Sequence, residues 1–175
     1  GCYICPGDTE EVAVPATLQA AISARVDRLD TAAKHTLNAA AVIGDRFDGN
    51  LLGQIADTDH LPRLVRAELV DQVAFTPRAE YAFRHPMIRS VVYRSQLRST
   101  RAEHHRRVAG AIEPSDENAA LIAEHLEAGG ELADAYDWHM RAGNWARFRD
   151  VRAARISWRR ACGVADRLPV DDPRR

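Results

Sequence analysis

The sequence predicts a mostly α-helical protein, in which a winged-helix-like domain with a small β-hairpin is followed by tetratricopeptide-like antiparallel helices. Three helical segments between residues 31 and 72 come before two short extended runs at 73–75 and 81–83. A turn around Pro77 joins these runs, and three helices followed by a hairpin is the element order of a winged helix. Beyond Pro86, apolar residues recur at helical spacing alone, which predicts a helical second half.

The winged-helix-like domain is expected to span residues 14–97. Its first helix, over residues 14–30, has apolar residues at spacings of four and three, namely Leu18, Ile22, Val26 and Leu29. The second helix is expected to begin at Thr31, which can cap it, and to end at Gly44. Two shorter helices follow before the hairpin.

Residues 98–175 are expected to form an α-helical, tetratricopeptide-like repeat region, and residues 1–13 a β-hairpin and linker. Two segments of the repeat region share one pattern, Ala135-x3-His139-x2-Ala142 and Ala154-x3-Trp158-x2-Ala161. Small residues at these places allow paired helices to approach closely, with one bulky residue filling the gap. The glycine at position 1 and the open helical end indicate a piece of a longer protein with further repeats.

Composition excludes several classes of protein. The 175 residues are 46% hydrophobic and 28% charged with a net charge of -1, which is typical of a globular protein and gives no overall field for nucleic acid or membrane. No apolar run approaches the roughly 18 residues that a membrane helix needs. The three cysteines form no disulfide framework, and no signal peptide is visible, so we expect a cytoplasmic protein.

No motif for catalysis, phosphate binding or metal binding is complete. Cys2 and Cys5 have C-x-x-C spacing, but no second pair of ligands lies nearby. Adjacent His104 and His105 would lie about 100° apart on a helix, a poor geometry for a metal pair. Glu124-His125 and Asp137-x-His139 are interpreted as polar groups on helix surfaces. We therefore expect no catalytic residue, no metal and no cofactor bound by this chain alone.

A basic stretch raises the alternative of a DNA-binding transcriptional regulator. Residues 84–107 hold seven arginines and one acid. The helix before the wing, residues 61–72, offers Arg63 and Arg66, but it also carries Glu68 and Asp71, which would repel phosphate. We expect the arginines instead to face acids between residues 115 and 137, so the sequence disfavours direct DNA binding. These acids are Asp116, Glu117, Glu124, Glu127, Glu131, Asp134 and Asp137.

Four blocks together resemble one family. The stretches "VPATLQAAISARVDRL" and "LNAAAVIGDRF" resemble the "VPxxLxxxIxxRLDxL" and "LxxAAVIGxxF" segments of bacterial STAND-type (AAA+-related) regulatory ATPases. The block "YAFRHPMIRSVVYRSQLRSTRAEHHRRVAGAIE" resembles their "YxFRHxLIRxVxYxxLxxxxRxxLHxxxAxxIE". Residues from "IAEHLEAGG" onward resemble the start of their helical-repeat region. One departure is His104, which stands where the family has an apolar residue.

The resemblance implies a non-catalytic coupling segment of a signalling ATPase. In that family a nucleotide-binding core with ATP or ADP and magnesium precedes this region, so residues 1–13 would be its tail. A repeat array follows, where a protein or small molecule would bind. The wording "AYDWHMRAGNWA" is most similar to actinobacterial, particularly mycobacterial, members fused to a class III adenylate/guanylate cyclase domain; other members carry a LuxR-type output domain or a protein kinase.

The stretch "FRHPMIR" is the candidate site. It resembles the "MHD" motif of related STAND proteins, whose histidine contacts the phosphates of ADP, so His85 would be the phosphate sensor with Arg84 and Arg89 beside it. Pro86 suits the first turn of a helix, which makes His85 the cap. Since histidine is a weak cap, its side chain could serve another purpose near a helix start whose N–H groups attract anions. The alternative is structural: His85 would bond a neighbouring loop and Arg89 a carboxylate.

Overall fold

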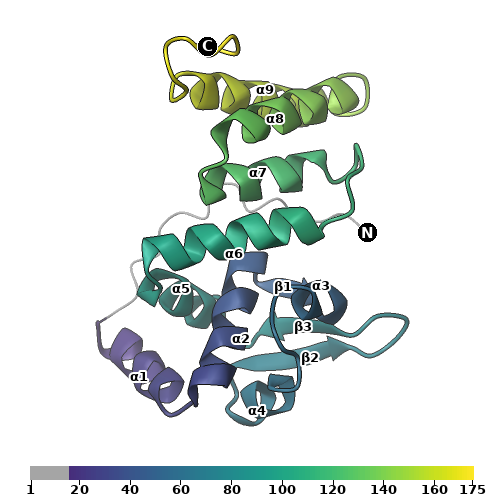
Figure 1. Cartoon of the computed structure of the whole chain (residues 1–175). Helices are drawn as coiled ribbons and strands as arrows, with labels where there is room; N and C mark the ends of the chain where they lie inside the picture. Colours follow the sequence, from purple (N-terminus) through teal and green to yellow (C-terminus); the bar gives the residue numbers. More distant parts are fainter. Residues whose placement is uncertain (1–15) are drawn as a thin grey trace. The chain divides into compact units, whose positions relative to one another are not determined.

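The computed structural model describes residues 16–175, and the chain divides into two compact units, Gly1–Arg101 and Ala102–Arg175 (Figure 1). The described residues form nine helices and one three-stranded antiparallel sheet. The prediction of a mostly α-helical fold with a small hairpin is therefore confirmed. The division falls inside α6 (Arg98–Ala111), a few residues after the boundary expected from the sequence. The hairpin expected at residues 1–13 lies outside the described residues.

Two helices open the first unit, α1 (Ala16–Asp27) and α2 (Thr31–Ile43). The side chain of Asp30, not Thr31, caps α2 by accepting a hydrogen bond from the Ala33 N–H at 2.7 Å. That bond is the main reason why the pKa of Asp30 lies below its usual range. The helix ends at Gly44, as the sequence predicts.

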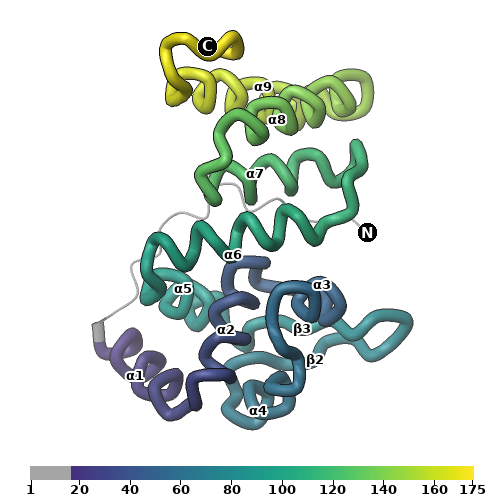
Figure 2. The backbone as a smooth tube through the Cα atoms, viewed as in Figure 1, coloured from purple at the N-terminus to yellow at the C-terminus, as the bar shows by residue number. Residues whose placement is uncertain are grey.

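A small sheet and two short helices complete the winged-helix topology. The elements in chain order are β1 (Arg46–Asp48), α3 (Gly49–Gly53), α4 (Leu61–Arg66), β2 (Val70–Ala74) and β3 (Glu80–Phe83). The spatial order of the strands is β1-β3-β2, so β1, which lies between α2 and α3 in the chain, pairs with β3, the last strand of the hairpin. The loop between β2 and β3 projects beyond the sheet (Figure 2).

Two sequence expectations for the wing domain are wrong. The helix expected over 61–72 ends at Arg66, and its last part is strand β2. The run "LVRAELV" fits either structure, and the chain reverses at Glu68, which has a left-handed φ of 54° that the residue type does not signal. Strand β1 was not expected, because three residues between a helix end and a capping aspartate show no alternating pattern.

Helix α5 (Pro86–Ser95) is fastened to the rest of the first unit. Ile88, Val91 and Val92 are buried, and the helix packs against α1 and α2. Two side chains also bind carbonyl groups of α2: Arg89 Nε donates to Ala41 at 2.9 Å, and Gln96 Nε2, just past the helix, donates to Asn38 at 3.1 Å. These long-range bonds fix α5 both along and around its axis.

The second unit stacks helices α7 (Ala119–Gly129), α8 (Leu132–Ala146) and α9 (Val151–Ala165) in chain order. Gly130, with φ of 85°, ends α7 in the left-handed conformation that glycine adopts readily. At Gly143 a Cβ would lie 2.3 Å from Trp158 Nε1, so the indole of α9 rests directly on the backbone of α8. This contact is the close approach that the repeated pattern predicts. Among residues 16–175, no helix combines the length and apolar character that crossing a membrane requires.

Candidate functional site

His85 begins helix α5 and is its cap. Its Nδ1 accepts a hydrogen bond from the Met87 N–H at 3.1 Å, with Pro86 in the first turn. Because Nδ1 accepts this hydrogen bond, Nδ1 itself carries no proton, and the ring proton lies on Nε2. The side chain is exposed, and Nε2 meets no hydrogen-bond partner in the described part of the chain. His85 therefore presents one N–H donor to its surroundings.

The backbone at this helix start is already hydrogen-bonded. Pro86 has no N–H group, the Met87 N–H is bonded to the His85 ring, and the Ile88 N–H donates to the His85 carbonyl at 2.9 Å. The expectation that His85 leaves its side chain unused and the N–H groups open to an anion is therefore wrong. The Nε2–H group and the helix dipole are what this end of α5 offers to an anion.

Arg84, which precedes His85 in the chain, forms ion pairs with two acidic side chains of the first unit. It binds Asp71 with two nitrogens, at 2.9 and 3.2 Å, and Glu68 with the third at 3.1 Å. The hydrogen bond from Arg84 is the largest influence that holds the pKa of Asp71 below its ordinary value. A phosphate could bind Arg84 only by displacing these carboxylates.

The side chain of Arg89 contacts other residues of the first unit. Besides the Ala41 carbonyl, its guanidinium lies 3.7 Å from the Asp45 carboxylate and 5.9 Å from the centre of the Tyr93 ring. This matches the structural alternative, in which Arg89 pairs with a carboxylate. Of the three residues that the sequence singles out, His85 is the one whose side chain forms no ion pair with a described residue.

The wing domain offers few cations to DNA. Arg63 of α4 forms an ion pair with Asp30, and Arg25 of α1 donates to the carbonyls of Ala67 and Glu68 at 2.8 and 2.9 Å. In the wing loop, Arg78 lies 3.9 Å from Asp48. Arg66 is exposed and has no ion pair with a described residue. Helix α4, at six residues, thus presents one unpaired arginine.

In the second unit, sequence reasoning missed a buried polar cluster. His139 of α8 is 1% exposed, and its Nε2 lies 3.3 Å from the Glu127 carboxylate of α7. Arg167, just after α9, binds the other oxygen of Glu127 at 2.6 Å, and Arg160 of α9 binds Glu124 at 3.1 Å. The interpretation of His125 and His139 as surface groups is wrong, since both are buried. His139 lies in the repeated alanine pattern, and that position was the signal of its burial.

The two glutamates of this cluster respond to burial in opposite ways. The hydrogen bond from His139 lowers the pKa of Glu127 more than burial raises it, with further help from Arg167. Burial dominates at Glu124 and raises its pKa in spite of Arg160. Nδ1 of His139 has no hydrogen-bond partner among residues 16–175, so the contact with Glu127 is made through Nε2 alone.

The buried histidines do not form a metal site. His105 and His125 approach with their Nδ1 atoms 2.8 Å apart, so one ring donates to the other. Within the described residues, no group of three or more His, Cys, Asp or Glu side chains could hold a metal ion. Both rings are buried.

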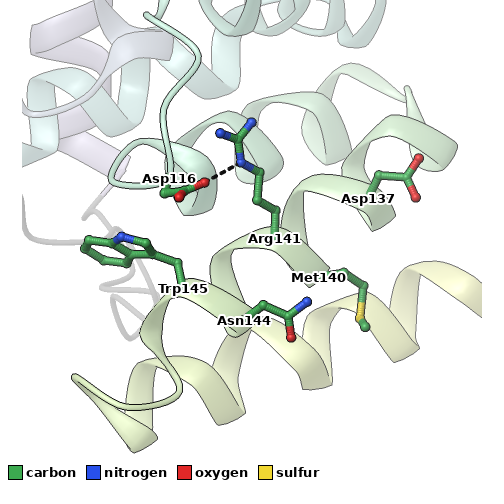
Figure 3. Close-up of a pocket in the computed structure, with 6 residues that line it drawn as sticks. All are labelled: Asp116, Asp137, Met140, Arg141, Asn144 and Trp145. Carbon is green, nitrogen blue, oxygen red and sulfur yellow. Dashed lines mark hydrogen bonds and ion pairs between the residues drawn. The ribbon is translucent and has the colours of Figure 1, made fainter.

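An open depression of about 480 Å³ on α8 is a second place to consider for a ligand (Figure 3). Its charged groups neutralise one another: Arg141 binds Asp116 at 2.6 Å, and Asp137 binds Arg174 at 3.0 Å. Neutral side chains supply the rest of the lining, which consists of Met140, Asn144 and Trp145. An ionic ligand would therefore compete with ion pairs that are already formed.

The acids between residues 115 and 137 pair mainly with later arginines. Asp116, Glu124, Glu127 and Asp137 bind arginines of α8, α9 and the segment after it. From the basic stretch at 84–107, Arg106 lies 3.7 Å from Glu131. The prediction that the arginines of this stretch face the acids of 115–137 is confirmed for Arg106. It is wrong for Arg84 and Arg89, whose acidic partners Asp71 and Asp45 lie in the first unit.

Comparison with known proteins assigns neither a family nor an activity. No family model and no solved structure matches the chain. The chain is similar to an uncharacterized protein of Rhizobium meliloti (strain 1021), with 29% identity over 134 residues, which is 70% of this chain. The matched region is 13% of that protein, so the chain spans about an eighth of its relative's length.

Proposed function

We propose that this chain is a non-catalytic coupling segment of a cytoplasmic, nucleotide-dependent signalling ATPase of the STAND type. In this role the winged-helix unit relays the nucleotide state of a preceding core to the helical repeats. The observation that carries the proposal is how α5 is held at its two ends: its N-terminal cap, His85, offers an exposed N–H donor, while Arg89 in the helix and Gln96 just after it are hydrogen-bonded to α2.

This arrangement suits a relay because a ligand that contacts His85 acts on the first turn of α5, and the rest of the helix is hydrogen-bonded to α2. A phosphate oxygen that accepts from His85 Nε2 would pull on the first turn of α5. The chain then reaches α6 through Gln96 and Leu97, and residues of α6 belong to both compact units. Arg84 and Arg89 act in this scheme as structural anchors and not as phosphate ligands.

In a longer ATPase, ADP with magnesium would occupy the preceding core, and a protein or small molecule would bind the repeats. An adenylate or guanylate cyclase or a LuxR-type output domain would read the signal, as the resemblance implies. The contribution of this chain to the nucleotide would be one donor, His85 Nε2.

Two substitutions at His85 separate nucleotide contact from helix capping. Alanine removes both the cap and the imidazole, whereas asparagine keeps a good cap and removes Nε2. In the longer protein we expect His85→Ala and His85→Asn to lower the amount of copurified ADP and to raise basal output to a similar extent. Bound nucleotide is measured by chromatography after denaturation. If His85→Asn retains ADP like the unmodified protein, the histidine serves the helix alone.

The alternative, raised by the arginine-rich residues 84–107, is a DNA-binding winged helix. Its difficulty is α4, where Arg63 is paired and Arg66 stands alone. Binding of duplex DNA that is salt-dependent and lost in Arg66→Glu would support this alternative over the relay.

A further inference from the structure

The outer side of helix α9 carries a stripe of arginines. Its inner side packs on α8 through small residues such as Ala154 and Ala161, both buried. At about 100° per residue, a second set of positions falls on the opposite side. We call this set the arginine face: Arg152, Arg155, Ile156, Arg159 and Gly163, all exposed.

The charges of the arginine face are uncompensated. None of Arg152, Arg155 and Arg159 forms an ion pair with a residue between 16 and 175, whereas Arg160 and Arg167 at its edges bind Glu124 and Glu127. The nearest acids in sequence do not neutralise it. Asp150 is occupied as the cap of α9, accepting from the Ala153 N–H at 2.9 Å, and Asp166 lies about 10 Å beyond Arg159 along the helix.

The acids elsewhere in the second unit do not neutralise it either. Asp116, Glu131 and Asp137 bind Arg141, Arg106 and Arg174, and no described acid forms an ion pair with the arginine face. The arginine face is therefore open to a negative partner from outside this unit. Three cations within two turns of one helix attract such a partner and favour its encounter.

The middle of the face is apolar and smooth. Ile156 is 47% exposed between the arginines, and a side chain placed at Gly163 would touch nothing within 4 Å. A surface with an apolar centre and cationic flanks is complementary to a helix with an apolar stripe and acidic flanks. A nucleic acid backbone would use the arginines but would gain nothing from Ile156.

We propose that the arginine face of α9 is a docking surface for an acidic amphipathic helix of a separate protein. The partner's carboxylates lie against Arg152, Arg155 and Arg159, and its apolar side chains cover Ile156 and the gap above Gly163. This surface is independent of His85 and of the relay proposed above.

The test uses the whole chain and a fluorescein-labelled synthetic peptide of about 20 residues, with leucine at every third or fourth position and glutamate on both sides. The triple variant R152E/R155E/R159E should bind this peptide about tenfold more weakly than the unmodified chain, by fluorescence anisotropy. The matched control R28E/R66E/R98E changes the net charge equally at exposed arginines without ion pairs to described residues, and should bind as the unmodified chain does. Circular dichroism establishes that each variant is folded.

A second comparison separates docking from general attraction between charges. Ile156→Ser should weaken binding of the leucine–glutamate peptide severalfold, but leave unchanged the weaker binding of a peptide with serine in place of leucine. The proposal is overturned if both triple variants weaken binding equally, if Ile156→Ser has no effect, or if duplex DNA of similar length binds more tightly than the peptide and depends on the same arginines.

Discussion

His85 and His139 each illustrate how one hydrogen bond determines what a histidine can do. At His85 the bond from the Met87 N–H occupies Nδ1, which leaves the exposed Nε2 as a donor. At His139 the bond runs from Nε2 to Glu127, and the ring itself is buried. The sequence identified the first histidine through its neighbours in the chain. It misjudged the second, because Glu127 and Arg167 approach His139 only after α7, α8 and α9 have packed.

Glu127 should make the second unit sensitive to acid. Its folded pKa lies below the ordinary value of 4.5, so its contribution to stability is complete above about pH 4.5 and is lost as the pH falls through the lower folded pKa. In Glu127→Gln we expect a smaller loss of unfolding free energy between pH 5 and pH 3, roughly the interval in which carboxylates titrate. Urea unfolding at several pH values measures it, and an unchanged pH profile would contradict the role of Glu127.

Elements whose signals are local could be predicted, and elements that depend on distant partners could not. Helix α2 ends at Gly44, and the alanine pattern of α8 and α9 indicates their pairing. Strand β1 is defined by its pairing with β3, far along the chain, and has no pattern of its own. The same holds at the candidate site, where Arg89 reaches Ala41 across 48 residues of sequence.

The contact of α9 with α8 depends on a glycine. Gly143→Ala would place a methyl group inside the contact distance of Trp158, and we expect a loss of about 1–3 kcal/mol in unfolding free energy, typical of overpacking. The matched control is Gly163→Ala, also in a helix but facing open space, which should be neutral or stabilising by up to about 1 kcal/mol. Chemical denaturation of both variants measures the difference. Equal stabilities would mean that Trp158 moves aside at no cost.

At the scale of the whole molecule, the chain passes from the winged-helix unit to the stack of helices by way of α5 and α6. The first unit holds α5 by its buried face and by two side-chain bonds to α2. The sequence predicted the two kinds of architecture, the first from helices followed by a hairpin and the second from the repeated alanine pattern of residues 135–161. It could not predict that Arg84 and Arg89 are anchors, because their partners Asp71 and Asp45 are brought near by the fold.

In the relay that we propose, α5 responds to the bound nucleotide through His85. The most direct measurement is deuterium uptake by residues 85–95 in the longer protein, compared between the ADP-bound form and the form bound to a non-hydrolysable ATP analogue. We predict slower exchange in the first turn of α5 in the ADP-bound form than in the form bound to the ATP analogue. In His85→Asn, which keeps the cap, the two forms should exchange at the same rate. Identical uptake in the two nucleotide states would contradict the claim.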